Sequence, residues 1–204
     1  MPRGLFVVLE GGEGAGKSTL LHALAARVAA TGREVLATRE PGGTAAGEQV
    51  RTLLHLPLTP WAETFAFLVA RSQLLAEVIL PALHRGATVI SDRYAASTFA
   101  YQGYGRGLDL AALQAANRLA TGGLEPDLTL FLDLDPAVGL ERKREEGEAI
   151  RTGLEDIEFH RRVRRGYTTM AMNAPPGTWV MLNASLPPET VAADAWDAVS
   201  AFLR

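Results

Sequence analysis

A glycine-rich segment near the start of the chain carries the residues best suited to chemistry. Gly11, Gly16, Lys17 and Ser18 match the pattern GxxxxGK[ST]. The glycines allow backbone N–H groups to converge on phosphate oxygens, and the lysine adds a positive charge at the same place. The serine hydroxyl is placed to ligate the Mg²⁺ that bridges those phosphates. The pattern therefore predicts a binding site for Mg·ATP.

The segment also has the neighbours that such a loop requires. It follows an apolar run at residues 5–10, and it precedes a helical repeat of Leu20, Leu24 and Val28. The first turn of a helix presents unpaired N–H groups and the positive end of a dipole to a bound phosphate. The loop residues that we expect to contact ATP are Gly11, Gly12, Glu13, Gly14, Ala15, Gly16, Lys17, Ser18 and Thr19.

Apolar runs and helical-period segments alternate along the whole chain. This pattern is typical of an α/β fold in which helices cover both faces of a parallel sheet. The five expected strands lie at residues 5–10, 34–38, 87–92, 128–133 and 179–183. A length of 204 residues accommodates this fold as one domain and requires no second one.

Composition restricts the class of partner. A net charge of −3 argues against a protein that binds mainly nucleic acid or an anionic membrane, because such partners usually require a basic surface. The longest strongly apolar stretches, such as residues 64–70, are much shorter than the roughly 20 residues of a membrane span. No basic region followed by a long apolar run appears at the N-terminus. We therefore expect a cytoplasmic protein.

The identity of the phosphate acceptor must be inferred from other parts of the sequence, because many unrelated enzymes share this loop. The guanine-reading sequence NKxD is absent, which disfavours a signalling GTPase. The third expected strand ends in Asp92 and Arg93, at the sheet edge where open α/β folds bind ligands. Asp92 is suited to the metal shell, and the Arg93 guanidinium to bidentate capture of a second phosphate. A surface ion pair is the alternative.

Longer motifs resemble those of bacterial thymidylate kinases. They are TREPGGT at residues 38–44, DRYAASTFAYQG at residues 92–103 and GLER at residues 139–142, together with the phosphate loop. The resemblance spans nearly the entire chain. It implies a nucleoside-monophosphate-kinase fold with a mobile lid at residues 141–153, a homodimer, and phosphorylation of dTMP to dTDP by Mg·ATP.

The resemblance also assigns residues to the dTMP pocket. Phe67 and Arg71 lie four residues apart in a helical segment, hence on one face, and the matching family residues stack on thymine and bond its exocyclic oxygen. Tyr101 matches a residue that lies against the sugar. Without the resemblance, Phe67 is an ordinary core aromatic. The other positions that match the pocket are Arg51, Arg93, Ser97, Thr98 and Gln102.

Two charged regions concern catalysis. Some family members carry an arginine inside the phosphate loop, but here that position is Gly14, so a lid arginine must supply the charge. We expect Arg142 to contact ATP and either Arg144 or Arg151 to reach the γ-phosphate. An acid at the position of Glu13 faces the acceptor sugar and the metal region in the family; a solvated Glu13 is the alternative. The catalytic candidates are Lys17, Arg93, Arg144, Arg151 and Glu13.

Two other functions stay open at the level of sequence. The first is a kinase of another monophosphate such as dUMP, because one methyl contact is worth only about 1–3 kcal/mol. The second is a nucleotide-binding protein without catalysis that has kept the loop. The basic run at residues 161–165 is interpreted as a solvated helix face rather than a nucleic-acid site, given the acidic total charge.

Overall fold

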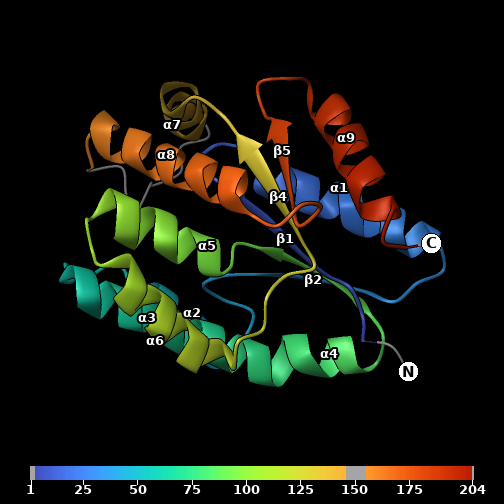
Figure 1. The fold of residues 1–204 in the computed structure, drawn as a ribbon, viewed down its shortest axis with the longest axis horizontal. Coiled ribbons are helices and arrows are strands. Elements are labelled where there is room, and N and C mark those ends of the chain that lie inside the picture. Colours follow the sequence, from blue (N-terminus) through green and yellow to red (C-terminus); the bar gives the residue numbers. More distant parts are fainter. Residues whose placement is uncertain (1–2, 146–154, 204) are drawn as a thin grey trace.

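A twisted parallel sheet forms the middle layer of the computed structural model, which describes residues 3–145 and 155–203 (Figure 1). Its strands are β1 (Phe6–Gly11), β2 (Val35–Arg39), β3 (Thr88–Asp92), β4 (Leu128–Asp133) and β5 (Trp179–Asn183). They lie in the order β2-β3-β1-β4-β5, and every neighbouring pair is parallel. Each strand begins and ends within one residue of its predicted bounds, and the predicted α/β fold class is confirmed.

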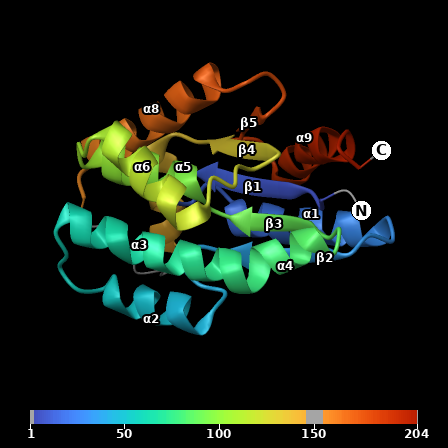
Figure 2. The same cartoon turned by 60° about the horizontal axis from the view of Figure 1, so that its bottom comes forward.

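Helices cover both faces of this sheet (Figures 1 and 2). One face carries α1 (Lys17–Ala30) and α9 (Pro188–Ser200). On the other face are α3 (Pro60–Leu74), η1 (Leu75–Ile79), α4 (Leu80–His84), α5 (Ala95–Thr98), η2 (Phe99–Gly105) and α8 (Ile157–Asn173). The remaining helices are α2 (Ala45–Leu53), α6 (Leu110–Thr121) and α7 (Pro136–Glu145).

The central strand β1 shows why the sheet is buried on both sides. Successive side chains point to opposite faces of a strand. Val7 and Leu9 pack against the core under α1 and α9, whereas Phe6 and Val8 pack against the core under η1 and α4. The carboxyl ends of β1, β3 and β4 are therefore held side by side by two separate apolar cores, and the loops that follow them meet at one edge.

The three segments α3, η1 and α4 form one helix over residues 60–84. By length and composition this helix could cross a membrane. The prediction that every apolar stretch is much shorter than a membrane span therefore does not hold for this helix. It counted uninterrupted apolar runs, whereas the helix reaches a high mean hydropathy over a stretch that includes Arg71 and Glu77. Half of its most apolar window is buried inside the fold, and Arg71 forms an ion pair with Glu40 there. The helix thus also serves as a core element of this domain.

Candidate functional site

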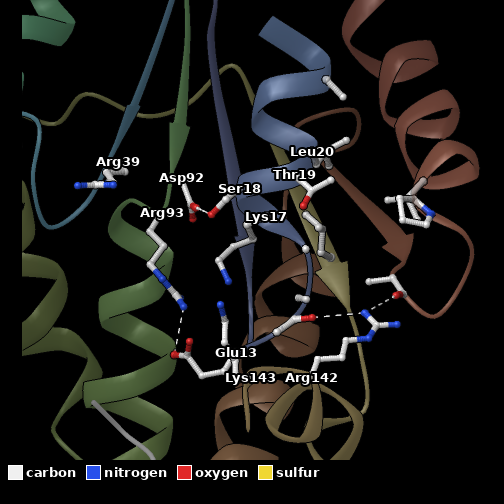
Figure 3. A pocket seen from close by; sticks show the side chains of 18 of the residues that line it. Glu13, Lys17, Ser18, Thr19, Leu20, Arg39, Asp92, Arg93, Arg142 and Lys143 are labelled. Carbon is white, nitrogen blue, oxygen red and sulfur yellow. Dashed lines mark hydrogen bonds and ion pairs between the residues drawn. The ribbon is translucent and has the colours of Figure 1, made fainter. Parts of the chain in front are cut away.

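A cavity of about 870 Å³ opens at the carboxyl ends of β1 and β3 (Figure 3). Cations dominate its charged lining: Arg39, Arg51, Arg93, Arg142, Lys17 and Lys143. The acidic lining residues are Glu13, Glu40 and Asp92. Because the cavity is lined by six basic and three acidic side chains, it is suited to a ligand with several negative charges.

The loop between β1 and α1 has the conformation that its glycines predict. Gly16 caps α1 in the left-handed region at φ 88°, and it has no side chain to occupy the helix N–H groups. Gly14 also has a positive φ of 65°, and a Cβ there would lie only 2.1 Å from the carbonyl oxygen of Gly139 on α7. A Cβ at Gly139 would in turn lie 2.1 Å from the backbone oxygen of Glu13. The loop therefore packs backbone against backbone on α7.

Lys17 lies at the centre of this loop. Its ammonium donates to the carbonyl oxygens of Gly11 at 3.1 Å and Gly12 at 2.7 Å. Burial, together with the positive charge of Arg93, lowers the pKa of Lys17 to about 8. A bound polyphosphate would reverse this shift, because a negative charge nearby favours the protonated amine.

Ser18 and Asp92 meet at the mouth of the loop. The Ser18 hydroxyl donates to Asp92 Oδ2 at 3.1 Å. The other carboxylate oxygen, Oδ1, is buried without a hydrogen-bond partner among the described residues. Hydroxyl and carboxylate oxygens are the ligands that Mg²⁺ prefers, and a buried oxygen without a partner is costly unless something binds it. The two side chains predicted to hold a metal therefore do come together and fit one.

Arg93 joins the loop to the helix after β3. The residue adopts a left-handed φ of 75°, and its backbone N–H donates to Leu9. Its guanidinium lies 3.2 Å from Glu13 Oε1, 3.3 Å from Ser97 Oγ and 3.4 Å from the Tyr101 hydroxyl. A non-glycine residue in this region of φ is strained, and such strain is typical of functional positions.

The Glu13 carboxylate is held rather than solvated. It also accepts a hydrogen bond from the Tyr101 hydroxyl at 2.9 Å. Burial alone would raise the pKa of Glu13, but the charges of Arg93 and Lys17 outweigh it and lower this pKa to about 2. The carboxylate is thus ionised at neutral pH and links the phosphate loop to the predicted acceptor residues.

Beneath Arg93 lies a network that the sequence did not reveal. Glu10 is fully buried and accepts hydrogen bonds from the backbone of Tyr94 and Ser97, from the Ser97 hydroxyl at 2.6 Å and from the Tyr167 hydroxyl at 2.9 Å. Burial raises the pKa of Glu10, with the Ser97 hydrogen bond and Arg93 acting against it. Glu10 therefore fixes the start of α5 and, through Ser97, the position of Arg93. Its only sequence signal is a charged residue within an otherwise apolar strand.

Arg71 is the hub of a second buried network. Its Nε and Nη2 bond to Glu40, Nη1 bonds to Thr98 and Asn117, and Nη2 also bonds to the carbonyl oxygen of Tyr94, at 2.6–3.1 Å. A guanidinium has five N–H donors, so these partners engage all of them. A thymine oxygen would have to share one of these donors or displace a partner. The predicted base contact by Arg71 stays a prediction.

The other predicted pocket residues lie on both sides of that network. Phe67 is partly buried and packs against an apolar cluster that includes Val50 and Leu54, and its stacking on thymine stays a prediction. Gln102 is buried in the π-helical segment η2 and donates to Glu63 Oε1 at 2.8 Å. Arg51 lines the cavity itself. The structure thus brings Arg51, Arg93 and Glu13 to the cavity, and it places Arg71, Thr98 and Gln102 behind it.

The cations of α7 differ in direction. Arg142 lines the cavity and donates to the carbonyl oxygens of Gly14 at 3.3 Å and Ala184 at 3.4 Å. Arg144 faces solvent and forms an ion pair with Glu141 at 3.2 Å. Arg151 lies outside the described residues, as does most of the predicted lid. The assignment of the catalytic arginine to Arg144 or Arg151 therefore stays a prediction.

Two cavity cations were not predicted to belong to the site. Arg39 stands at the end of β2, within the motif TREPGGT, and that motif was the available signal. Lys143 follows Arg142 in a charged stretch where sequence alone does not show which side chains face the cavity. The rotation of α7 about its axis decides this, and the rotation depends on packing.

Comparisons with known proteins identify the family of the chain. The sequence model of the family described as thymidylate kinase matches residues 9–195. The chain belongs to the thymidylate kinase family. Thymidylate kinase of Deinococcus radiodurans is 48% identical over 203 residues, with 98% of each chain covered. That of Synechococcus sp. strain JA-3-3Ab is 49% identical over 197 residues, covering 96% of this chain and 95% of its own.

A solved structure supports the same family assignment. The crystal structure of thymidylate kinase from Ehrlichia chaffeensis superposes with a TM-score of 0.82 at 30% sequence identity. The match covers 97% of this chain and 100% of the other. Because the family model matches residues 9–195, the carboxyl end of β1, all of β3 and the loops that follow them lie within the matched region.

Proposed function

We propose that this protein phosphorylates dTMP to dTDP with the γ-phosphoryl group of Mg·ATP. The observation that carries the proposal is the arrangement around Glu13, which joins the phosphate loop to Arg93 and Tyr101. One cavity thereby holds a triphosphate site and, directly beside it, an arginine suited to a second phosphate. A simple ATPase would not need that arginine. Membership of the thymidylate kinase family supplies the identity of the acceptor.

The reaction needs no general base. The phosphate of dTMP is largely dianionic at neutral pH, because its second pKa is near 6. One of its oxygens attacks the γ-phosphorus directly. The obstacle is repulsion between two polyanions, so catalysis depends on in-line positioning and on cations around the transferred group. A cavity wall with six cations suits this requirement.

The residues divide this task between donor and acceptor. Lys17 supplies charge at the β- and γ-phosphates, with N–H groups of the loop and of the first turn of α1. Arg93 and Arg51 hold the phosphate of dTMP. Glu13 pairs with Arg93 and so holds it near the loop, and by the family resemblance the Glu13 carboxylate faces the sugar of the acceptor. The acceptor phosphate is thus aligned by a residue of the donor loop.

We assign the Mg²⁺ that accompanies ATP to Ser18 and Asp92. Their oxygens lie 3.1 Å apart, and the second Asp92 oxygen has no hydrogen-bond partner in the part of the chain that the structure describes. When bound, the ion would neutralise charge on the β- and γ-phosphates. Asp92→Asn should therefore raise the Mg²⁺ concentration needed for half-maximal activity, measured by Mg²⁺ titration at fixed ATP.

An ADP-release assay with dTMP, dUMP, dCMP, AMP and GMP as acceptors tests the function. We expect turnover with dTMP to exceed turnover with each of the others. Preference for a different monophosphate would replace the proposal by a kinase of that acceptor. Absence of turnover with every acceptor, in protein that binds ATP, would indicate a non-catalytic nucleotide-binding protein.

We further propose that the protein is a homodimer. Large apolar side chains are exposed on adjacent helices: Leu53 and Leu56 at the end of α2, and Phe65 and Val69 one turn apart on α3. Their exposed fractions are between 42% and 59%. Because α2 and α3 pack against each other, exposed apolar side chains on both are typical of an interaction surface. Val69→Asp should convert a dimer to a monomer in size-exclusion chromatography with light scattering, and a wild-type monomer would contradict the proposal.

The remaining proposals concern organisation. We regard the chain as one kinase domain whose lid comprises residues 141–153, acting in the cytoplasm without nucleic-acid or membrane partners. Arginines of the basic run on α8 already have partners within the fold, which supports this view: Arg162 donates to Gly105, and Arg164 pairs with Asp133. Fractionation of cells and detection of the protein in the soluble fraction test the location.

A further inference from the structure

Lysine is rare in this protein, and its distribution is informative. Of the 20 basic residues, 18 are arginines, and the two lysines are Lys17 and Lys143. Both line the same cavity. Lys17 belongs to the phosphate loop, whereas Lys143 comes from α7, more than a hundred residues later in the chain. The chain thus uses arginine at the other positions and places a second lysine opposite the first.

The direction of the α7 side chains separates three consecutive cations. Neighbouring residues of a helix are turned by about 100° from one another. Lys143 is partly buried and points from α7 toward Lys17 and Glu13 (Figure 3). Arg142 is held by the carbonyl oxygens of Gly14 and Ala184, to one side of the loop. The Arg144 side chain is 72% exposed and pairs with Glu141. Among these three, Lys143 is the cation that points toward Lys17 and Glu13.

We propose that Lys143 is a catalytic residue whose ammonium contacts the γ-phosphoryl group during transfer. The proposal rests on the kinase function proposed above. During transfer, a bond forms between an oxygen of the dTMP phosphate and the γ-phosphorus. The bond from the γ-phosphorus to the β,γ-bridging oxygen breaks, and its electron pair stays with ADP. Lys143 compensates the negative charge that is then spread over the γ-phosphoryl oxygens.

The chemistry of a lysine fits this place. An ammonium is a compact point charge with three donors that can follow a moving phosphoryl oxygen, whereas a guanidinium acts through a rigid fork. Lys17, Arg93 and Lys143 would surround the γ-phosphoryl group from the loop, from the end of β3 and from α7. The backbone contact between Gly14 and Gly139 fixes the distance from loop to α7. The third cation is therefore positioned by the described part of the fold.

Steady-state kinetics of three variants test the catalytic role. Lys143→Ala should lower kcat about 10- to 100-fold with little change in the KM for ATP, because the contact strengthens in the transition state. Lys143→Arg, which keeps the charge, should retain more activity. Arg161→Ala is the matched control, since Arg161 is an exposed helical cation paired with Glu158 on α8, and it should stay within about twofold. A Lys143→Ala enzyme within about twofold of wild type would overturn the proposal.

Lysine labelling provides a test that does not depend on turnover. Reductive methylation with formaldehyde, followed by peptide mass spectrometry, reports Lys17 and Lys143 separately. A non-hydrolysable ATP analogue with Mg²⁺, at about 100 times its Kd, leaves roughly 1% of the enzyme free and should slow methylation of both lysines at least tenfold. ADP lacks the γ-phosphate, so it should protect Lys17 and leave Lys143 largely reactive.

The outcomes separate the two proposals. Protection of Lys17 without protection of Lys143 by the ATP analogue would overturn the role of Lys143 and leave the kinase function intact. Protection of neither lysine would contradict nucleotide binding, and with it the proposed function. Equal protection of Lys143 by ADP and by the ATP analogue would overturn the γ-phosphoryl contact.

Discussion

The phosphate loop and the region around Arg71 are built in opposite ways. In the loop, Lys17 bonds to carbonyl oxygens of its own loop, and Asp92 keeps one buried oxygen without a hydrogen-bond partner among the described residues. Around Arg71, all five N–H donors already bond to protein. The first region is arranged to exchange protein contacts for ligand contacts. The second region is a hydrogen-bond network within the protein that stabilises the fold. Substitutions in the loop should therefore lower activity, whereas substitutions around Arg71 should lower stability.

Lys17→Ala should cause the largest loss of activity. Without the ammonium, the charge at the β- and γ-phosphates is uncompensated, and turnover should fall about 10³-fold or more. The fold should survive, because burial of this charge is a cost that its lowered pKa reveals. Turnover is measured by ADP release, and circular dichroism checks the fold. Near-normal activity in a folded variant would contradict the role of the loop.

Arg71→Ala should instead damage the fold. Removing one partner of a buried ion pair leaves Glu40 charged and uncompensated, which costs about 3–5 kcal/mol of unfolding free energy. Urea denaturation measures this loss. Arg85→Ala is the control: Arg85 pairs with Glu34 at 2.9 Å, but both side chains are more than half exposed, so the loss should be under about 1 kcal/mol. A stable Arg71→Ala protein with a raised KM for dTMP would assign Arg71 to the substrate.

Glu13→Gln tests the connection between the two regions. The change removes the charge that holds Arg93 near the loop, and one charge-assisted hydrogen bond is worth about 1.5–3 kcal/mol. We expect kcat/KM for dTMP to fall at least tenfold, while the Kd of ATP changes less. Wild-type kinetics for dTMP would show that Glu13 is not needed to align the acceptor.

The same variant has a pH signature in stability. The pKa of Glu13 is lowered from 4.5 to about 2 in the folded state, so its contribution to stability is fully present above pH 4.5. That contribution is lost as the pH falls through 2. The difference in unfolding free energy between wild type and Glu13→Gln should therefore shrink between these two values. A constant difference would mean that the carboxylate is not stabilised in the fold.

The pH dependence of ATP binding gives the smallest effect. Lys17 has a pKa of about 8 in the free protein, and bound ATP raises it. Binding is therefore strongest below pH 8, and the Kd of ATP should rise by up to tenfold per pH unit above 8. Isothermal titration calorimetry in buffers of different ionisation enthalpy should show proton uptake near pH 8. No proton uptake would indicate that Lys17 stays fully charged without ligand.

Sequence was most informative where the determinants are local. The strand of residues 128–133 and the loop of residues 11–18 are each specified by neighbouring residues, through apolar runs and glycine spacing, and both were predicted correctly. Arg93, Ser97 and Tyr101, which the family resemblance assigns to one pocket, do lie together, although Arg93 precedes α5 and the segment from Phe99 is a π-helix. A loosened helical turn still brings side chains four apart together.

The networks behind the site could not be predicted in this way. Arg71 bonds to Glu40, Thr98 and Asn117, which lie 31, 27 and 46 residues away in the sequence. No pattern of spacing links such residues, because tertiary packing brings them together. The cations of α7 show the same limit of sequence-based prediction. The sequence shows a charged stretch, but it does not show that Lys143 faces the cavity.

The contact between Gly14 and Gly139 has an evolutionary consequence. A Cβ at either glycine would lie 2.1 Å from a backbone oxygen of the other segment, so neither position can carry a side chain unless the loop and α7 move apart. An arginine transferred into the loop at position 14 would collide with α7 unless that helix moved first. The two ways of supplying a catalytic cation, from the loop or from α7, are therefore separated by a barrier that single substitutions do not cross. An engineer who wishes to exchange them must redesign the loop and α7 together.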